Sequence, residues 1–278
     1  MADIRDALFE EIYEFGKKDK NVIVLTADAD AFALHKFKKE FPDRFYNMGV
    51  SEQNTILFAT GLAMGGKKVF IYSIIPFITM RCFEQIKTHV CSMNLPVTII
   101  GLGAGLSFGF DGPTHHAMHD IGVMRMLPEL TIYNPSDSAT AKLSIKSAYD
   151  SGTPHYIRLD KGEFPSNPNS TYVADGVREC RKMSRHINVI TTGTILSTVL
   201  DATRGLDIGV YDVYKLKSFP SKFILDISHY GWNMFTVEEH SIEGGLGSMV
   251  HSCMDGGSSQ LTKLALPHAQ LYEYGTRK

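Results

Sequence analysis

Short apolar runs rich in β-branched residues alternate with stretches of helical periodicity along the first half of this chain. Runs that are apolar on both faces suit strands covered by helices on both sides, as in a parallel sheet. Such alternation is typical of an open α/β layer fold. The predicted helices include Ser51–Met64 and Ser136–Tyr149, and the predicted strands are Val22–Thr26, Val69–Ser73, Val97–Gly101, Thr131–Tyr133 and His155–Leu159.

A polar stretch rich in Pro, Asn, Ser and Gly interrupts this pattern after Pro165 and is predicted to be a linker. A second, shorter alternation follows it. We therefore predict two open three-layer α/β/α domains with mostly parallel sheets: a first domain over 1–165, a linker over 166–185 and a second domain over 186–278. The elements predicted for the second domain are strands at Ile187–Thr192, Ile208–Val213, Met234–Glu238 and Leu261–Leu266, a helix near Thr194–Arg204 and a helix from Leu246.

The composition favours a soluble, reduced, cytoplasmic protein. The 278 residues are 44% apolar and 21% charged, with a formal net charge of −2, which gives no reason to expect a nucleic acid as partner. The start of the chain has the pattern of an amphipathic helix rather than a signal peptide, and no apolar run approaches the ~20 residues needed to cross a membrane. The cysteines form no CxxC pair, which argues against a zinc site and against a secreted disulfide scaffold; they are Cys82, Cys91, Cys180 and Cys253.

The segment MGVSEQN, Met48 to Asn54, places Glu52 in the first turn of a predicted helix. An acid is favoured there by the helix dipole alone, and Ser51 is a candidate N-cap. A catalytic role for Glu52 is the alternative, and this segment by itself does not decide between the two.

A glycine-rich loop, Gly101 to Asp120, follows a predicted strand and contains several groups able to transfer protons. In open α/β sheets, ligands bind at the carboxyl ends of the strands, which makes this loop a candidate site. Metal binding by His115, His116 and His119 is a second interpretation, but no further ligand cluster accompanies these histidines.

Two other segments have competing interpretations. In EEHSIEGGLGS, Glu238 to Ser248, the glycine pair before a helix suits either phosphate binding or, as we favour, close backbone packing across a subunit interface. In Tyr72–Val90, a strand leads through Pro76 into a helix, so that Phe77 lies at the turn, where its ring is able to stack on a ligand. Arg81 is expected to be a structural ion-pair partner.

Taken in order, these segments closely resemble the transketolase and deoxyxylulose-phosphate synthase family. The shared elements are GVSEQN, a turn bearing a phenylalanine, DGPTHH, NPSD at Asn134–Asp137, and EEHSIEGGLGS. The resemblance spans almost the whole chain and corresponds to a pyrimidine-binding domain followed by the C-terminal transketolase domain. It therefore implies the C-terminal subunit of a split transketolase, which transfers a two-carbon ketol unit between sugars.

The resemblance also implies thiamine diphosphate as cofactor and a second polypeptide to hold it. In this family the cofactor lies between the diphosphate-binding domain of one unit and the pyrimidine-binding domain of another. The GDG…N motif that holds the metal and the diphosphate is absent here, and the nearest candidate, Asp255–Gly257, lies in the second domain. The implied partner is an N-terminal transketolase subunit that holds Mg²⁺ or Ca²⁺, in a heterotetramer of two such subunits and two copies of this chain, with no metal ligand from this chain.

Residue by residue, Glu52 matches the glutamate that activates the cofactor at its pyrimidine ring. Phe77, or Tyr72 in its place, is the candidate for stacking on that ring. Each of these three residues is therefore expected to bind the cofactor, and Glu52 is expected to be catalytic.

The substrate is implied to contact a second group of residues. Asp111 and His115 match residues that bind the hydroxyl groups of the sugar donor, and His115 is also expected to move protons. His116 replaces a frequent glutamine. Lys161 in RLDKG matches a phosphate-binding arginine, but it offers a point charge in place of a bidentate fork.

Three departures leave the reaction open. Gly103 or Ala104 stands where the family usually has a histidine or arginine that meets substrate, Phe110 replaces a small or acidic residue, and Lys161 replaces arginine. Ketol transfer is the first hypothesis, with a substrate that lacks phosphate or holds it differently. The second is a decarboxylative reaction, as in the synthase branch or the 2-oxo-acid dehydrogenase β subunits. The third is a non-catalytic, regulatory relative.

Overall fold

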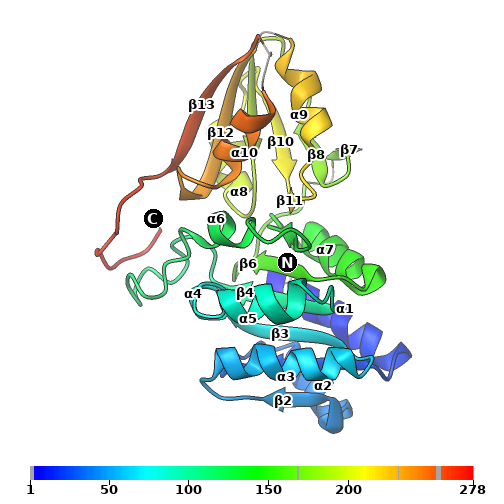
Figure 1. Cartoon of the computed structure of the whole chain (residues 1–278). Coiled ribbons are helices and arrows are strands. Elements are labelled where there is room, and N and C mark those ends of the chain that lie inside the picture. Colours follow the sequence, from blue (N-terminus) through cyan, green and yellow to red (C-terminus); the bar gives the residue numbers. More distant parts are fainter. Residues whose placement is uncertain (1–2, 168, 231, 255–257, 278) are drawn as a thin grey trace.

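The chain forms two α/β units, each built around one sheet, as Figure 1 shows for a computed structural model. The structure describes residues 3–167, 169–230, 232–254 and 258–277. The Asp255–Gly257 segment therefore lies outside the described residues. No helix among the described residues has the length and apolar character that a membrane span requires.

The first sheet has seven strands in the order β11-β5-β6-β4-β3-β1-β2. All neighbours are parallel except β11, which pairs antiparallel with β5. The five strands predicted for this half of the chain are confirmed to within a residue at each end. The bounds are β1 Val22–Thr26, β2 Phe45–Asn47, β3 Lys68–Ile74, β4 Val97–Leu102, β5 Thr131–Tyr133, β6 His155–Leu159 and β11 Lys215–Lys217.

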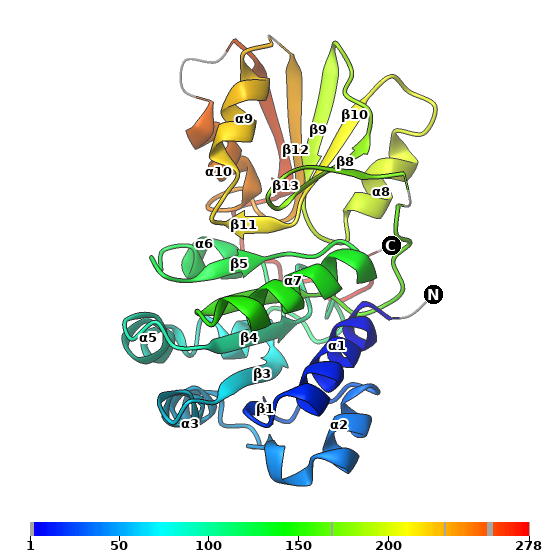
Figure 2. The same ribbon diagram turned by 90° about the vertical axis from the view of Figure 1, so that its right-hand side faces the viewer.

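Helices cover both faces of this sheet, which explains why its central strands are apolar on both sides (Figure 2). One face packs against α1 (Ile4–Lys18), α2 (Leu34–Glu40) and α7 (Ser138–Ser151). The other packs against α3 (Glu52–Met64), α4 (Ile75–Ile78), α5 (Phe83–Gln85) and η2 (Ile86–Cys91). The short η1 (Pro42–Arg44) follows α2, and α6 (Asp120–Met124) lies beneath the second unit.

The second sheet has six strands in the order β13-β12-β9-β10-β8-β7. The strands from β13 to β10 are parallel, whereas β8 and β7 are antiparallel to their neighbours. Figure 2 shows α8 on one side of the sheet and α9 and α10 on the other. The bounds are β7 Thr171–Ala174, β8 Val177–Arg181, β9 Ile187–Thr191, β10 Gly209–Val213, β12 Asn233–Ser241, β13 Gln260–Leu266, α8 Leu196–Ala202, α9 Ser221–Ser228 and α10 Leu246–Cys253.

The interpretation of 166–185 as a linker was wrong, because this stretch contains β7 and β8. Its prolines and asparagines precede β7, and the two strands then form a hairpin at the edge of the second sheet. The strand β11 crosses in the opposite sense: it comes from the second half of the chain but extends the first sheet. Division at 165 and 186 thus remains a proposal about domains, not a description of the sheets.

A buried ion-pair cluster joins the two units and explains the NPSD segment. Asp137 caps α7 by accepting the Thr140 N–H, and its other oxygen accepts Nη1 of Arg178 at 2.9 Å. Arg178 also donates through Nη2 to Asp212 at 2.8 Å, and it is almost fully buried. Removal of one partner from such a cluster would leave a buried charge uncompensated, so the cluster fixes how the units meet.

Candidate active site

The predicted site residues come from segments that follow several strands of the first sheet. Glu52 begins α3 after β2, Phe77 lies in α4 directly after β3, His115 lies in the loop after β4, and Lys161 follows β6. Because the strands are parallel, these segments leave the sheet at one edge, the edge where open α/β sheets bind ligands.

Glu52 is a buried acid paired with a partly exposed base. Its side chain is 4% exposed, and its Oε2 lies 2.9 Å from Nη1 of Arg81, whose side chain is 46% exposed. Arg81 is thus an ion-pair partner, as expected, and Glu52 itself is the acid that it contacts. Ser51 occupies the N-cap position but does not cap with its side chain, since its hydroxyl donates to the Met48 carbonyl at 2.7 Å.

A continuous row of side chains extends from this ion pair. The guanidinium of Arg81 lies 4.5 Å from the centre of the Phe77 ring, and that ring meets the edge of His115 at 5.0 Å between centroids. His115 lies 6.0 Å from the Phe108 ring, over which Nζ of Lys161 sits at 4.5 Å. The fold therefore brings together Phe77, His115 and Lys161, which are far apart in the sequence.

The remaining residues of the DGPTHH segment differ in exposure. Asp111 is exposed, and His115 is half-buried with Nδ1 at 3.0 Å from the Thr114 hydroxyl. His116 is 5% exposed, and neither of its ring nitrogens has a hydrogen-bond partner among the described residues. Buried polar atoms are normally paired, so the His116 ring is suited to a partner such as water or a bound hydroxyl group.

The placement of Tyr72 as a cofactor contact is corrected by the structure. Side chains alternate across β3, and Tyr72 falls on the face covered by α1, where it is fully buried and meets Phe9 edge-on at 4.8 Å. Its ring belongs to the core between the sheet and α1. Phe77, which contacts Arg81 and His115, is therefore the better stacking candidate.

The EEHSIEGGLGS segment also differs from both interpretations given to it. The two oxygens of Glu238 accept the Leu246 and Gly247 N–H groups, each at 2.7 Å, so this carboxylate already occupies the N-terminus of α10. An added Cβ at Gly245 would lie 2.0 Å from Glu238 Oε2, and one at Gly244 would lie 3.0 Å from the Gly122 Cα. The glycines do permit close packing, but within this chain, between α6 and the turn before α10.

Sequence reasoning missed a buried polar network beneath the loop. Asp120 Oδ2 accepts the Tyr156 hydroxyl at 2.7 Å and Nε of Arg158 at 2.9 Å. Nη2 of Arg158 donates to the Ala117 and Glu239 carbonyls, which ties the loop to the second sheet. An arginine inside the otherwise apolar run of β6 was the available signal, because a buried guanidinium requires such partners.

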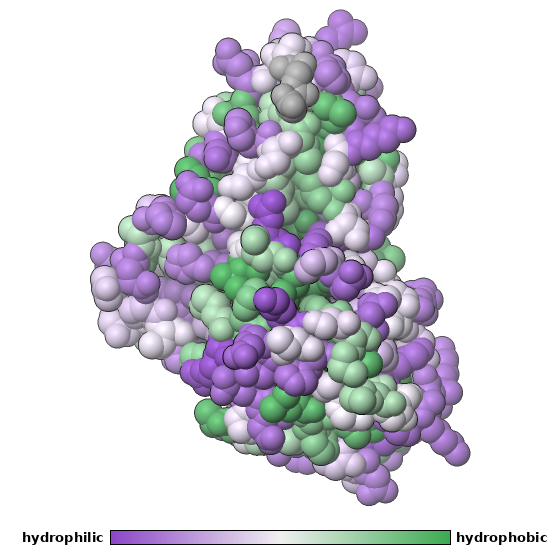
Figure 3. All heavy atoms as spheres, viewed as in Figure 1, coloured by the Kyte–Doolittle hydropathy of each residue, from purple (hydrophilic) through white to green (hydrophobic). Residues whose placement is uncertain are grey.

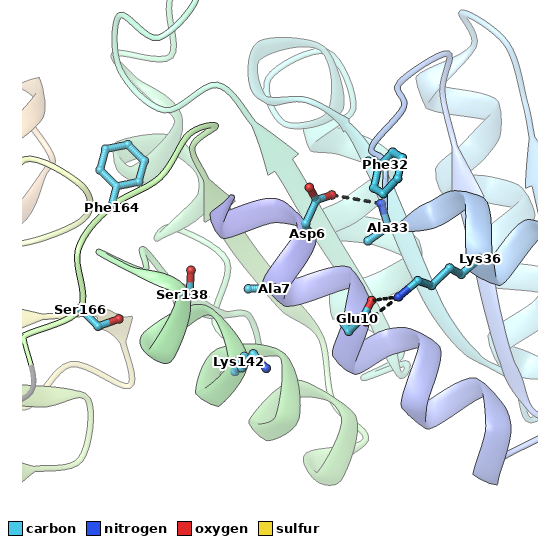
Figure 4. A pocket seen from close by; sticks show the side chains of 10 residues that line it. All are labelled: Asp6, Ala7, Glu10, Phe32, Ala33, Lys36, Ser138, Lys142, Phe164 and Ser166. Atoms are coloured by element: carbon cyan, nitrogen blue, oxygen red, sulfur yellow. Dashed lines mark hydrogen bonds and ion pairs between the residues drawn. The ribbon is translucent and has the colours of Figure 1, made fainter. Parts of the chain in front are cut away.

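A hollow of about 570 Å³ lies elsewhere, between α1, α2 and α7 (Figure 4). Its charged groups satisfy each other: Nζ of Lys36 pairs with Glu10 at 2.7 Å, and Asp6 accepts the Ala33 N–H at 3.0 Å. This hollow lies among helices on the face opposite α3, so it contributes nothing to the row that begins at Glu52. Within the described ranges, no group of three or more His, Cys, Asp and Glu side chains is arranged to hold a metal ion.

A two-sheet α/β chain with a buried acid, an aromatic ring and a histidine at one strand edge is of the class that binds a small molecule at that edge. Residues 1–167 match the family described as "Transketolase, pyrimidine binding domain". The chain belongs to the transketolase family.

The relatives include both split transketolases and synthases. One of the two chains of the apulose-4-phosphate transketolase of Actinobacillus succinogenes is 32% identical over 254 residues, which cover 89% of this chain and 82% of the relative. A 1-deoxy-D-xylulose-5-phosphate synthase of Nitrosomonas eutropha is 31% identical over 261 residues, covering 91% of this chain but only 42% of that protein.

Solved structures support the same assignment. A split-gene transketolase, solved as an inactive beta4 tetramer, superposes with a TM-score of 0.85 at 28% identity and covers 96% of this chain and 89% of that one. A transketolase of Pichia stipitis at 20% identity, with a TM-score of 0.78, covers 95% of this chain and 41% of that one and shares the fold.

Proposed function

We propose that this chain is the pyrimidine-side subunit of a split transketolase, which transfers a two-carbon ketol unit between sugars with thiamine diphosphate shared with a partner subunit. The observation that carries this proposal is the buried carboxylate of Glu52 at the head of a row containing Phe77 and His115. The first two provide the acid and the ring that a protonated heteroaromatic group requires, so the residues fit the cofactor.

When bound, thiamine diphosphate supplies the carbon nucleophile that cleaves and forms the bond next to a ketose carbonyl. Glu52 holds a proton at the pyrimidine nitrogen, which is the step that activates the cofactor. Phe77 packs against the pyrimidine ring. Arg81 fixes the Glu52 carboxylate, since it binds Oε2 and also lies over the Phe77 ring.

The loop after β4 binds the sugar. Asp111 and His115 orient the hydroxyl groups of the donor, and His115 also passes protons, with its ring held between Phe77 and Phe108. The unpaired ring nitrogens of His116 suit an additional hydroxyl group. Lys161 supplies a single positive charge for a phosphate, in keeping with the sugar phosphate in the names of relatives.

An apolar surface next to Glu52 supports the need for a partner chain. The outward face of α3 and the turn before it leave several large apolar side chains in solvent, and Figure 3 shows apolar patches on this side of the lower unit. Exposed apolar area of this kind marks protein–protein contacts. We assign it to an N-terminal subunit that carries the diphosphate-binding domain and holds Mg²⁺ or Ca²⁺, in a heterotetramer with two copies of each chain. The side chains are Val50 (75% exposed), Leu57 (43%), Phe58 (39%) and Met64 (63%).

Calorimetric titration of thiamine diphosphate and Mg²⁺ tests the assignment, with this chain alone and with its co-expressed partner. Binding only to the complex is the expected result. Glu52→Gln keeps the shape of the site but removes the acid, so it is expected to lower ketol transfer at least a hundredfold, whereas Glu14→Gln on the exposed face of α1 leaves it unchanged. Tight binding by the isolated chain would overturn the shared site, and full activity of Glu52→Gln would favour a non-catalytic relative.

A decarboxylative reaction is the second candidate, because the Nitrosomonas eutropha synthase is nearly as similar as the split transketolases. The two reactions differ in donor: a ketose such as apulose 4-phosphate for ketol transfer, and pyruvate for decarboxylation. Release of CO₂ from pyruvate by the complex, without turnover of any ketose, would favour the synthase reaction.

A further inference from the structure

A segment from the far end of the chain runs along the loop that carries Asp111 and His115. We call residues 267–277 the strap; it leaves β13 and descends beside the loop of 103–116 (Figure 1). The two run in opposite directions: Arg277 donates to the Ala104 carbonyl, and the Gly275 N–H donates to the Gly109 carbonyl at 3.1 Å.

The two backbones approach closely at glycines of the loop. An added Cβ at Gly109 would lie 2.4 Å from the Gly275 carbonyl oxygen, and one at Gly112 would lie 2.5 Å from Cε1 of Tyr274. Such distances leave no room for a side chain, so these glycines are required by the strap. Gly112 directly follows Asp111, which places the contact next to a proposed substrate residue.

Arg277 fastens the strap to two carboxylates that also hold the loop. Its Nη1 donates to Asp160 Oδ2 at 2.6 Å, and its Nε donates to Glu239 Oε1 at 2.9 Å. Asp160 also accepts the Ser107 hydroxyl at 2.7 Å, and Glu239 accepts the Leu106 N–H at 2.8 Å. Asp160 follows β6 of the first sheet and Glu239 lies in β12 of the second, so one guanidinium joins both units to the loop.

The charges at this junction need Arg277. The Asp160 side chain is 1% exposed and that of Glu239 is 15% exposed, while Arg277 bonds to both. Burial raises the pKa of Glu239, and the Arg277 guanidinium opposes that rise. Loss of the guanidinium would leave two poorly solvated carboxylates side by side, which is unfavourable through both desolvation and repulsion.

We propose that Arg277 is a positioning residue: it anchors the strap and thereby holds the 103–116 loop in the conformation that presents Asp111 and His115. The proposal rests on the proposed function only for what the loop binds. A loop released from the strap populates other conformations, and the apparent affinity for its ligand falls in proportion to the fraction that remains competent.

Hydrogen–deuterium exchange tests the structural half of this proposal on the full chain. Arg277→Ala is expected to speed exchange in peptides from 103–116 about tenfold, with Arg277→Lys in between and most other peptides unchanged. The matched control is Arg204→Ala, which removes an exposed arginine paired with Asp201 on the far side of α8. Exchange in the loop that is the same in Arg277→Ala as in the native chain would overturn the proposal.

Steady-state kinetics on the complex test the functional half. Arg277→Ala is expected to raise KM for the ketose donor about tenfold, with kcat and thiamine diphosphate affinity within about twofold of the native values, and Arg277→Lys is expected to recover part of the loss. A merely structural role would lower kcat through loss of folded enzyme and leave KM unchanged, and that result would overturn the positioning role. If the complex transfers no ketol unit at all, the proposed function fails, while the exchange rates still decide whether Arg277 holds the loop.

Discussion

The Glu52 carboxylate and the Arg81 guanidinium form an ion pair of 2.9 Å in which the acid is buried and the base is half exposed. A guanidinium that reaches in from solvent stabilises the buried carboxylate at a smaller desolvation cost than two buried charges would incur. The pair also fixes the direction in which Glu52 points, because Arg81 is held in turn through its carbonyl, which accepts Nε2 of Gln53 at 3.2 Å.

Arg81→Ala is therefore expected to lower the free energy of unfolding by about 1–2 kcal/mol, less than for a fully buried pair because Arg81 is half exposed. Urea unfolding at pH 7 measures this difference. Arg204→Ala, which breaks an exposed pair, should change stability by less than about 0.5 kcal/mol. Equal losses in the two variants would contradict the special role of the Glu52 pair.

Phe77 and Tyr72 are separated by their effect on the cofactor. Phe77→Leu keeps apolar volume but loses the ring, so we expect thiamine diphosphate to bind the complex about tenfold more weakly. Tyr72→Phe removes only a hydroxyl buried in the core beside α1, so cofactor affinity should not change. Calorimetry on both variants distinguishes the rings, and weaker binding by Tyr72→Phe alone would reverse the assignment.

Lys161 is expected to recognise phosphate by charge. Lys161→Ala should raise KM about five- to tenfold for a phosphorylated ketose and leave KM for an unphosphorylated ketose unchanged, because a lone exposed lysine contributes about 1 kcal/mol. Lys146→Ala, on the exposed side of α7, is the control. A similar rise in KM for both kinds of ketose would show that Lys161 does not contact the phosphate.

His240 gives stability a defined pH dependence. Burial lowers the pKa of His240 from 6.5 to about 4, with Arg158 and His119 lowering it further and Asp120 opposing them. The neutral ring donates from Nδ1 to the Ser241 carbonyl at 2.9 Å and accepts the Gly122 N–H at Nε2.

Since the unfolded chain binds a proton at His240 below about pH 6.5 and the folded chain does not until about pH 4, acid favours the unfolded state in this window. His240 should thus cost about 1.4 kcal/mol of stability per pH unit as the pH falls from 6.5 to 4. Unfolding free energies of His240→Asn, measured across that range, should lack this contribution, whereas those of His35→Asn, at an exposed site, should keep it. Parallel pH profiles for the native chain and His240→Asn would refute the shift.

The packing of α6 against the turn before α10 is tested by two glycines with nearly the same backbone. Gly244 has φ +79° and an added Cβ would lie 3.0 Å from the Gly122 Cα, whereas Gly205 has φ +78° with open space around it. Both alanine variants incur the same backbone strain, so Gly244→Ala should lose about 1–2 kcal/mol more stability than Gly205→Ala. Chemical unfolding of both variants measures the difference, and equal losses would mean that the contact yields without cost.

Local pattern predicted the central strands and missed the edges for one physical reason. Strands such as β3 and β4 are apolar on both faces because helices cover both faces, and that pattern is visible in the sequence. The edge strands β2 and β7 are short and largely exposed, so they lack any apolar run to detect. The segment 166–185 was therefore taken for a linker, although pairing with β10 makes it part of the second sheet.

The sequence by itself determined the α/β class, the order of the central strands along the chain and the segments that carry Glu52, Phe77, His115 and Lys161. These follow from hydrophobic periodicity and from the segments' positions after strands, both of which are local properties. Only the tertiary structure decided which side chains meet. The alternation of β3 sent Tyr72 into the core, and the fold brought Arg81 to Glu52 and Arg277 to Asp160, 117 positions away along the chain. Contacts of this kind depend on how the two sheets pack together, and residue type and spacing do not encode that packing locally.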